Sequence, residues 1–255
     1  MQDTQRRPLI SVVIPARNEA KNLYHVLPSI PAIVDEVILV DGSSTDDTIE
    51  VAQQLLTNIR IIEQIDTGKG AALRAGFAAS NGDIIVMLDA DGSTNPQEIP
   101  LFVAGLMQGF DFAKGSRFLM GGGSSDITFL RRLGNNFLCG LVNLLFGTNF
   151  SDLCYGYNAF WRHCLEPLNI DCSGFEIETQ LNLHAHKCAL KVIEIPSFEH
   201  ERIWGESKLR TFSDGWRVLC TIIKERGRNK PQSPYNQPAT LYPAGAESKS
   251  TLPLL

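Results

Sequence analysis

The sequence has no excess of positive charge, no long apolar run and no paired cysteine motif. Its 255 residues carry 23 Lys and Arg against 28 Asp and Glu, a net charge of −5 with histidine neutral. An acidic chain lacks the basic surface that nucleic-acid binding requires, so nucleic acid is not an expected partner. No stretch approaches the roughly 20 apolar residues that span a bilayer. The polar N-terminal extension, residues 1–8, lacks the apolar region of a signal peptide. We therefore expect a cytoplasmic protein.

The six cysteines are scattered, and none belongs to a C-x-x-C pair. This spacing is typical of neither a zinc site nor a disulfide scaffold, and it fits reduced cysteines in a cytosolic protein. The remaining composition, 44% hydrophobic and 20% charged, is that of an ordinary globular protein. A chain of this length forms either one large α/β domain or two small ones.

Short apolar runs alternate with helical patterns in the first half of the chain. Strands are predicted at 9–14, 37–40, 59–62 and 84–88, and helices at 18–27, from an N-cap at Thr45, and at 70–79. This alternation indicates right-handed βαβ units and a parallel sheet.

The second half of the chain is less regular. Strands are predicted at 112–114, 155–161 and 192–195, and helices at 127–146, 176–187 and 209–226. From about residue 227 the composition turns to Pro, Ser, Asn and Gln without periodicity, which predicts a disordered tail over 227–255.

Two acidic motifs follow predicted strands directly. Asp41 follows the second strand, and Asp89-Ala90-Asp91 follows the fourth. Because ligands bind beyond the carboxyl ends of the strands in such sheets, both motifs should face one crevice. Residues two apart on an extended segment point the same way, so Asp89 and Asp91 present two carboxylates together. Such a pair suits Mg²⁺ or Mn²⁺ bridged to a diphosphate; the alternative is a solvated loop with capping aspartates.

Two helix starts are candidates for contacts with phosphate. Lys69 lies between Gly68 and Gly70 in a segment of small residues, where either a phosphate or tight helix–sheet packing explains the glycines. The predicted helix at 127–146 is apolar nearly all round and carries Arg131 and Arg132 near its start. It fits either an element in a membrane interface, with its arginines meeting a lipid phosphate, or a buried core helix. The basic residues of the last helix favour anionic lipid or form a solvated face.

Motifs in a fixed order resemble those of family 2 glycosyltransferases with the GT-A fold. They are SVVIP at 11–15 with Asn18 and Glu19, VDGS at 40–43, GKG at 68–70, LDAD at 88–91 and GSR at 115–117. Segments at 152–160, 174–178 and 202–209 resemble the branch of dolichyl- and polyprenyl-phosphate mannosyltransferases. The resemblance covers about residues 10–226. It implies a single GT-A (Rossmann-like) catalytic domain over 9–226, with a mixed, mostly parallel central sheet flanked by helices.

The same resemblance implies inverting transfer of a hexose from a nucleotide sugar, of the GDP-mannose or UDP-glucose type. The implied acceptor is a polyprenyl or dolichyl phosphate at the cytoplasmic membrane face, with peripheral membrane contact and a possible separate anchor subunit. Asp89 and Asp91 match the metal ligands, with Mg²⁺ or Mn²⁺ as cofactor, and join Arg117 and Lys208 as the implied catalytic residues. The implied nucleotide-sugar contacts are Pro15, Ala16, Asn18, Glu19, Asp41, Lys69, Asp89, Ala90, Asp91, Arg202 and Ser207. The acceptor candidates are Arg117, Arg131, Arg132, Glu176 and Glu178.

The chemical nature of the acceptor decides whether a general base is needed. A lipid phosphate is already an anion at pH 7 and needs cationic guidance, whereas a hydroxyl of a glycan or glycolipid needs a carboxylate base. Glu176 and Glu178 are candidates for that base, and helix N-terminal stabilisation is the alternative explanation for each. A third hypothesis is a non-enzymatic nucleotide-binding or scaffold subunit of a membrane complex.

Overall fold

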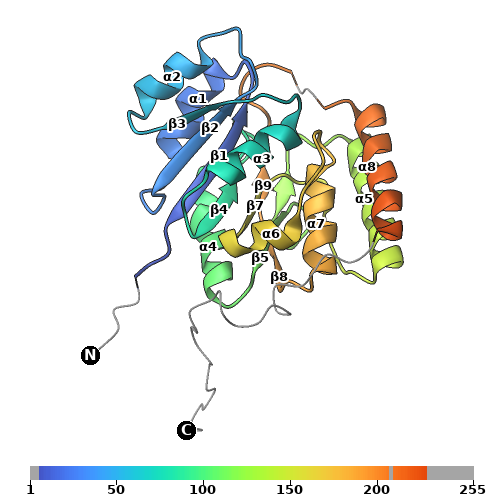
Figure 1. The fold of residues 1–255 in the computed structure, drawn as a ribbon. Coiled ribbons are helices and arrows are strands. Elements are labelled where there is room, and N and C mark those ends of the chain that lie inside the picture. Colours follow the sequence, from blue (N-terminus) through green and yellow to red (C-terminus); the bar gives the residue numbers. More distant parts are fainter. Residues whose placement is uncertain (1–5, 207–208, 229–255) are drawn as a thin grey trace, which may run out of the picture.

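The computed structural model describes residues 6–206 and 209–228, which fold around a seven-stranded sheet (Figure 1). Its strand order is β3-β2-β1-β4-β7-β5-β8. β7 runs antiparallel to β4 and β5, and all other neighbours are parallel. The predicted mixed, mostly parallel sheet is therefore confirmed. The strands are β1 (Ile10–Ala16), β2 (Glu36–Asp41), β3 (Arg60–Glu63), β4 (Ile84–Met87), β5 (Phe112–Ser116), β7 (Asn158–Trp161) and β8 (Val192–Pro196).

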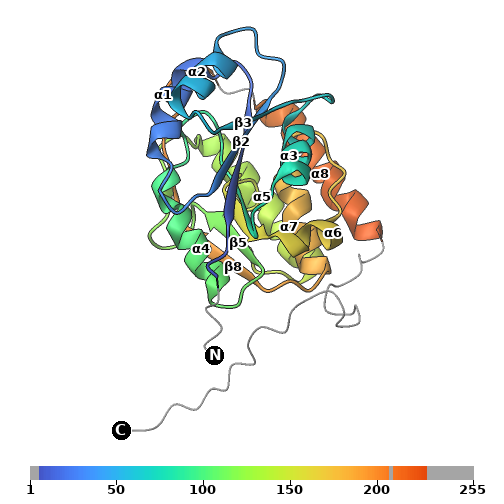
Figure 2. The same ribbon diagram turned by 60° about the vertical axis from the view of Figure 1, so that its left-hand side comes forward.

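Helices cover both faces of the sheet, as Figure 2 shows. α1 (Ala20–Val26), α2 (Thr48–Leu55) and α4 (Ile99–Met107) lie on one face. α3 (Lys69–Ala79), α6 (Leu165–Leu168) and α7 (Ile177–Lys187) lie on the other. This double cover explains why the strands read as continuous apolar runs.

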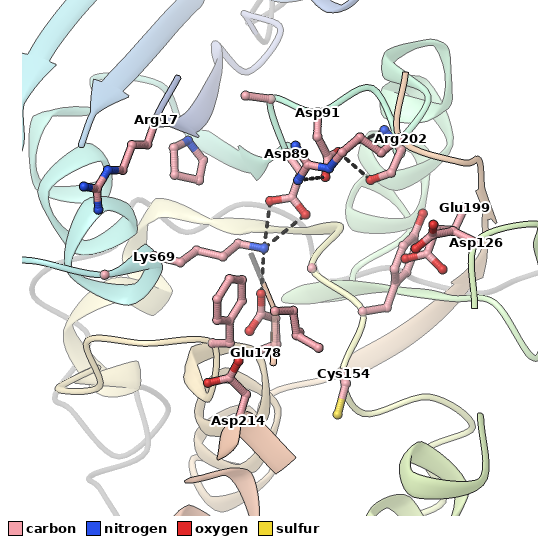
Figure 3. A pocket seen from close by; sticks show the side chains of 18 of the residues that line it. Arg17, Lys69, Asp89, Asp91, Asp126, Cys154, Glu178, Glu199, Arg202 and Asp214 are labelled. Atoms are coloured by element: carbon pink, nitrogen blue, oxygen red, sulfur yellow. Dashed lines mark hydrogen bonds and ion pairs between the residues drawn. The ribbon is translucent and has the colours of Figure 1, made fainter. Parts of the chain in front are cut away.

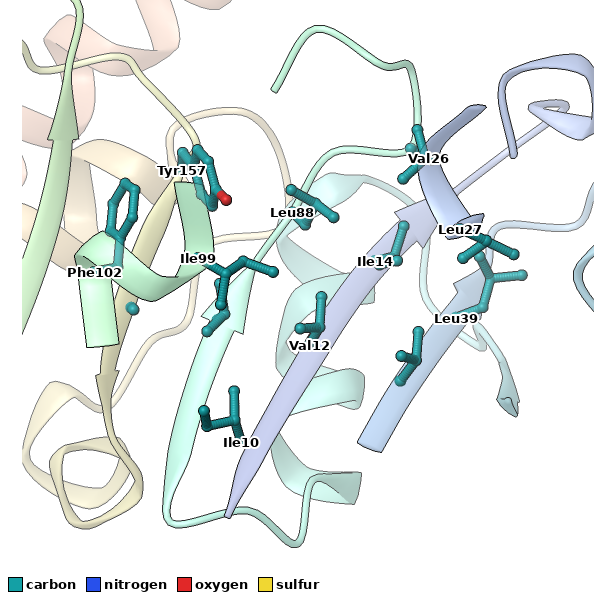
Figure 4. Packing of buried hydrophobic residues seen from close by; sticks show 14 of the residues in the cluster. Ile10, Val12, Ile14, Val26, Leu27, Leu39, Leu88, Ile99, Phe102 and Tyr157 are labelled. Atoms are coloured by element: carbon teal, nitrogen blue, oxygen red, sulfur yellow. The ribbon is translucent and has the colours of Figure 1, made fainter. Parts of the chain in front are cut away.

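Alternation along β1 divides the core into two clusters. Val12 and Ile14 pack with residues of the first helix layer (Figure 4), whereas Val13 packs with the second. Phe102 from α4 stacks on Tyr157 at a ring-centroid distance of 4.4 Å. These contacts hold the strand ends in a rigid frame, on which the loops beyond them are positioned.

α5 (Phe129–Phe146) and α8 (Thr211–Gly227) pack against each other beside the sheet. Leu138 and Val142 of α5 meet Val218 and Ile222 of α8 in a third apolar cluster. The opposite side of α5 is exposed, with Phe137 64% accessible. The core explanation is confirmed for one side of α5, and the other side is an apolar surface whose role stays a prediction.

Several element boundaries differ from the sequence predictions by a few residues, among them three N-terminal ones. α2 begins at Thr48 and not after Thr45, because the Asp46 side chain accepts the Thr48 backbone N–H at 3.2 Å. The first helix begins at Ala20, since Asn18 has a φ of 54°. The strand expected from residue 155 begins only at Asn158.

Most of the remaining elements are short. The helix α4 is longer, but no sequence prediction includes it. α4 carries apolar residues on its exposed side as well, so no polar stripe marks its helical period. The 3-10 turns are η1 (Leu27–Ser29), η2 (Pro96–Glu98) and η3 (Arg162–Cys164), and a two-stranded sheet joins β6 (Gly123–Ser124) to β9 (Phe198–Glu199). The predicted tail beyond residue 228 lies outside the described residues.

Candidate active site

A cavity of about 730 Å³ opens where the parallel strands end. The loops after β1 to β5 all contribute to it, because the carboxyl ends of parallel strands meet at one edge of a sheet. The expected crevice is therefore present, and both acidic motifs adjoin it. Its lining from these loops includes Pro15, Ala16, Gly42, Ser43, Gln64, Lys69, Asp89, Ala90, Asp91 and Arg117.

The Asp89 and Asp91 carboxylates lie together at this edge, each beside a basic side chain (Figure 3). Lys69 Nζ is 2.7 Å from Asp89 Oδ1 and 3.0 Å from Oδ2. Arg202 Nη2 is 2.8 Å from Asp91 Oδ2. Ala90 between them is buried in the core cluster, as predicted, although residues 90–91 form a turn and not an extended segment. Two anionic oxygen ligands are thus presented to one region of the cavity.

Lys69 also contacts a third carboxylate, which belongs to α7. Its Nζ lies 2.8 Å from Glu178 Oε1, and both side chains are almost completely buried. Burial lowers the pKa of Lys69, but Asp89 and Glu178 outweigh it and raise that pKa above its ordinary value. Burial raises the pKa of Glu178, against the opposing effect of Lys69. Lys69 is therefore a fixed positive charge between two helices and the end of β4.

The backbone at Gly156 passes close to the side chains of Lys69, Asp89 and Glu178. A Cβ at this position would lie 2.9 Å from Lys69 Nζ and 3.1 Å from Asp89 Oδ2. At these distances a side chain at position 156 would force the ends of the Lys69 and Asp89 side chains to shift. Gly156 is in the segment 152–160 that resembles the mannosyltransferase branch.

The segment 200–204 crosses the Asp89–Asp91 loop and reaches α1. Arg202 Nη1 lies 3.1 Å from Glu19 Oε1. This ion pair links two residues that are predicted to contact the nucleotide sugar. The Trp204 backbone N–H donates to Asn22 Oδ1 at 2.9 Å, and the His200 N–H donates to the Ser93 carbonyl at 2.8 Å. These bonds hold Arg202 over the carboxylate pair.

Arg117 is held rigidly by two carboxylates on the other side of the cavity. Its Nε and Nη2 donate to Asp152 at 2.7 and 2.9 Å, and its Nη1 lies 3.1 Å from Glu199 Oε2. The guanidinium also lies over the Tyr155 ring, 5.0 Å from its centroid. Burial raises the pKa of Asp152, but the hydrogen bond and charge of Arg117 outweigh it and lower that pKa. Arg117 thus keeps its charge and orientation at the cavity wall.

Asp41 and Asn18, two of the predicted nucleotide-sugar contacts, are not among the lining residues of the cavity. Asp41 is buried, and its Oδ2 accepts the Ser44 N–H at 3.0 Å. Its Oδ1 is buried without a hydrogen-bond donor among the described residues. Asn18 Oδ1 accepts the Thr45 N–H at 2.7 Å, which ties together the loops after β1 and β2.

The acceptor candidates separate into two groups. Arg131 and Glu178 line the cavity together with Arg117, whereas Arg132 and Glu176 do not. Arg132 lies over the Phe118 ring, 5.6 Å from its centroid, and Glu176 accepts the Gly174 N–H at 3.2 Å. Ser207 and Lys208 are outside the described residues.

Several lining or supporting residues escape the sequence analysis. Gln64 and Asp66 follow β3, so the rule that ligands bind beyond strand ends could have found them. Asp152 is in a motif that carries the resemblance, but its bond to Arg117 joins residues 35 apart. No motif contains Glu199, which is brought to Arg117 by β9.

Residues 11–168 of the chain match the sequence profile described as Glycosyl transferase family 2. The chain belongs to this family. The dolichol-phosphate mannosyltransferase of Pyrococcus furiosus is 30% identical over 229 residues, which are 86% of this chain and 64% of that protein. The dolichyl-phosphate hexose transferase of Haloferax volcanii is 30% identical over 219 residues, covering 84% of this chain and 92% of that protein.

Solved structures share the fold of this glycosyltransferase family member. Glucosyl-3-phosphoglycerate synthase of Mycobacterium tuberculosis superimposes with a TM-score of 0.69 and 24% identity. The similarity covers 87% of this chain and 81% of that protein. Together with the observed sheet topology, it confirms the predicted GT-A fold.

Proposed function

We propose that this protein transfers a hexose from a nucleotide sugar to a polyprenyl or dolichyl phosphate. The proposal rests on one observation above all, that a single cavity joins the Asp89–Asp91 edge to an apolar end between α5 and α8. Arg117 and Arg131 also line this cavity, and their guanidinium groups suit an anionic acceptor group. Two relatives that carry names of lipid-phosphate hexosyltransferases support the same acceptor. The donor is of the GDP-mannose or UDP-glucose type.

Asp89 and Asp91 are proposed to hold Mg²⁺ or Mn²⁺ together with the donor diphosphate. One or two carboxylates completed by phosphate oxygens are the usual protein site for Mg²⁺, so the donor set fits. The M. tuberculosis synthase with this fold was crystallised with Mn²⁺ and UDP. When bound, the ion neutralises charge on the leaving diphosphate.

The proposed reaction forms one bond and breaks another at the sugar C1. An acceptor phosphate oxygen attacks C1, and the bond from C1 to the nucleoside diphosphate breaks with its electron pair leaving on the diphosphate. Attack from the opposite face inverts the anomeric centre, as in glycoside hydrolysis. Arg117 stabilises phosphate charge from a fixed position, and no rotamer has to be ordered during the reaction. Arg202, Ser207 and Lys208 remain the proposed contacts for the donor phosphates.

A hydroxyl acceptor is the second candidate, because Glu178 lines the cavity and its pKa is raised. A carboxylate with a raised pKa is suited to accept a proton. The two acceptors predict different results for Glu178→Gln. Loss of a general base lowers the rate by roughly 100-fold or more, whereas a phosphate acceptor leaves a substantial rate.

Peripheral membrane contact is proposed for the apolar surface of α5 and α8. This surface, the α5–α8 face, comprises the exposed residues Phe129, Leu133, Phe137, Leu144, Phe212, Trp216 and Ile223. It adjoins the apolar end of the cavity, and Arg132 and Arg217 add positive charge suited to the anionic cytoplasmic leaflet. None of the described helices is long and apolar enough to span a bilayer. A separate anchor subunit stays a prediction.

The experiment that tests the function presents nucleotide sugars to the protein with two matched acceptors. A polyprenyl phosphate and the corresponding phosphate-free polyprenol are each incubated with GDP- and UDP-hexoses in Mg²⁺ or Mn²⁺. We expect sugar in the lipid fraction only with the phosphate, and not with Asp91→Asn. Transfer to the alcohol or without lipid contradicts the proposal.

A further inference from the structure

Each of the two carboxylates proposed to bind the metal is already paired with a basic side chain of the protein. Lys69 lies within 2.7 Å of Asp89, and Arg202 lies within 2.8 Å of Asp91. All four side chains are largely buried, with 14 to 26% of each exposed. Ion pairs of this kind are weakly screened by solvent, so a cation that arrives alone must compete with two fixed positive charges.

Lys69 is the stronger of the two competitors. It contacts both oxygens of Asp89, and Glu178 anchors its other side at 2.8 Å. The backbone at Gly156 passes close to the ammonium, because a Cβ there would lie 2.9 Å from Lys69 Nζ. Arg202 contacts a single oxygen of Asp91, and Glu19 anchors its other side at 3.1 Å.

We propose that Lys69 is an internal counter-ion that keeps Asp89 from binding a divalent cation unless a nucleoside diphosphate binds with it. The inference rests on the proposed function, because it assumes that Asp89 and Asp91 bind a metal–diphosphate complex. A diphosphate supplies new anionic partners for Lys69 and Arg202 and thereby releases the carboxylates for the cation. A cation that arrives without a diphosphate brings no anionic partner for Lys69 or Arg202, so the two carboxylates stay paired.

The proposal has a thermodynamic signature. If the diphosphate tightens cation binding by some factor, the cation must tighten diphosphate binding by the same factor. Without Lys69 the carboxylate is open to the bare cation, so this coupling factor falls. A purely structural role for Lys69, as a link between α3 and α7, predicts lower stability without any gain in affinity for the bare cation.

The test measures Mn²⁺ binding to the full chain by titration calorimetry and by the electron paramagnetic resonance of free Mn²⁺. Each titration is run alone and with GDP or UDP, without sugar donor or lipid. The variants are Lys69→Met and the double variant Lys69→Met/Glu178→Gln, which avoids leaving Glu178 buried without a partner. Lys191→Met, an exposed lysine beside the start of β8, is the matched control. Thermal unfolding establishes that each variant is folded.

We expect the double variant to bind bare Mn²⁺ roughly tenfold more tightly than the wild type, with a coupling factor reduced to match. Lys191→Met should leave both quantities unchanged. Unchanged or weaker binding of bare Mn²⁺ by the folded double variant overturns the proposal. The binding test measures no sugar transfer. A protein that shows the expected coupling between Mn²⁺ and diphosphate but transfers no hexose would therefore overturn the proposed function and leave the role of Lys69 standing.

Discussion

Arg117 illustrates how single side chains set the chemistry of this cavity. Its guanidinium is oriented by Asp152 and Glu199, so it is held at the cavity wall before any ligand binds. Lysine keeps the charge but cannot reproduce the two parallel bonds to Asp152. We expect Arg117→Lys to lower kcat roughly 100-fold, as the loss of a preorganised charge does elsewhere. Steady-state kinetics measure this.

Arg132→Lys is the control for that substitution, because Arg132 lies outside the cavity lining. Its kcat should stay close to that of the wild type. A kcat for Arg117→Lys equal to that of Arg132→Lys would show that the orientation of Arg117 does not matter.

Gly156 gives a second prediction for a single residue. In Gly156→Ala the new methyl group would meet Lys69 Nζ at 2.9 Å and Glu178 Oε1 at 3.2 Å, so these side chains must shift. We expect at least about a tenfold loss of kcat with the fold retained, since small displacements of catalytic groups are costly. Circular dichroism and kinetics together test this. Gly140→Ala, whose Cβ meets open space on α5, should instead stabilise the protein by about 0.5–1 kcal/mol.

At the scale of whole elements, the α5–α8 face predicts binding to membranes. The double variant Phe137→Asp/Trp216→Asp places charges on two exposed apolar side chains, which are 64% and 65% accessible. We expect it to lose flotation with vesicles of anionic phospholipid while the wild type floats. Leu101→Asp on α4, an exposed apolar residue away from this face, is the control. Equal flotation of all three proteins contradicts the proposed contact.

The packing of α8 on α7 depends on the buried Glu225. Its Oε2 lies 2.8 Å from Lys187 Nζ. Burial acts to raise the pKa of Glu225, but Lys187, His184 and Arg228 outweigh it and lower that pKa to about 2. Because the folded pKa lies below the ordinary 4.5, this stabilisation is present above pH 4.5 and is lost as the pH falls toward 2.

We therefore expect Glu225→Gln to lower the free energy of unfolding by about 3 kcal/mol at pH 7. The difference from the wild type should shrink as the pH falls from about 5 toward 2. Urea unfolding across this range measures it. A difference that stays constant with pH would show that Glu225 is not charged in the folded protein.

The helices also show what sequence patterns reveal about elements. α3 and α7 were predictable because their apolar residues and flanking motifs are local. α5 was left between two explanations, because its buried side meets Val218 and Ile222 of α8, far along the chain. Periodicity identifies an amphipathic helix but does not identify its partner.

Across the whole molecule, the sequence predicted the sheet and the position of the carboxylate pair. β4 is a buried run that leads directly to Asp89, and the rule for strand ends is general for parallel sheets. The pairing of Arg117 with Asp152 and Glu199 was not predictable, because these partners are 35 and 82 residues away along the chain. Nor did spacing indicate that Lys69 and Arg202 would pair with Asp89 and Asp91, since those contacts depend on how α3 and the segment 200–204 pack.

We propose that this member of glycosyl transferase family 2 attaches a hexose to a lipid phosphate. Phosphorus-31 nuclear magnetic resonance of the lipid acceptor, recorded during incubation with the nucleotide sugar and Mn²⁺, tests it most directly. We expect the phosphomonoester signal to convert into a phosphodiester signal as nucleoside diphosphate appears. Consumption of the donor while the phosphomonoester remains intact would contradict it.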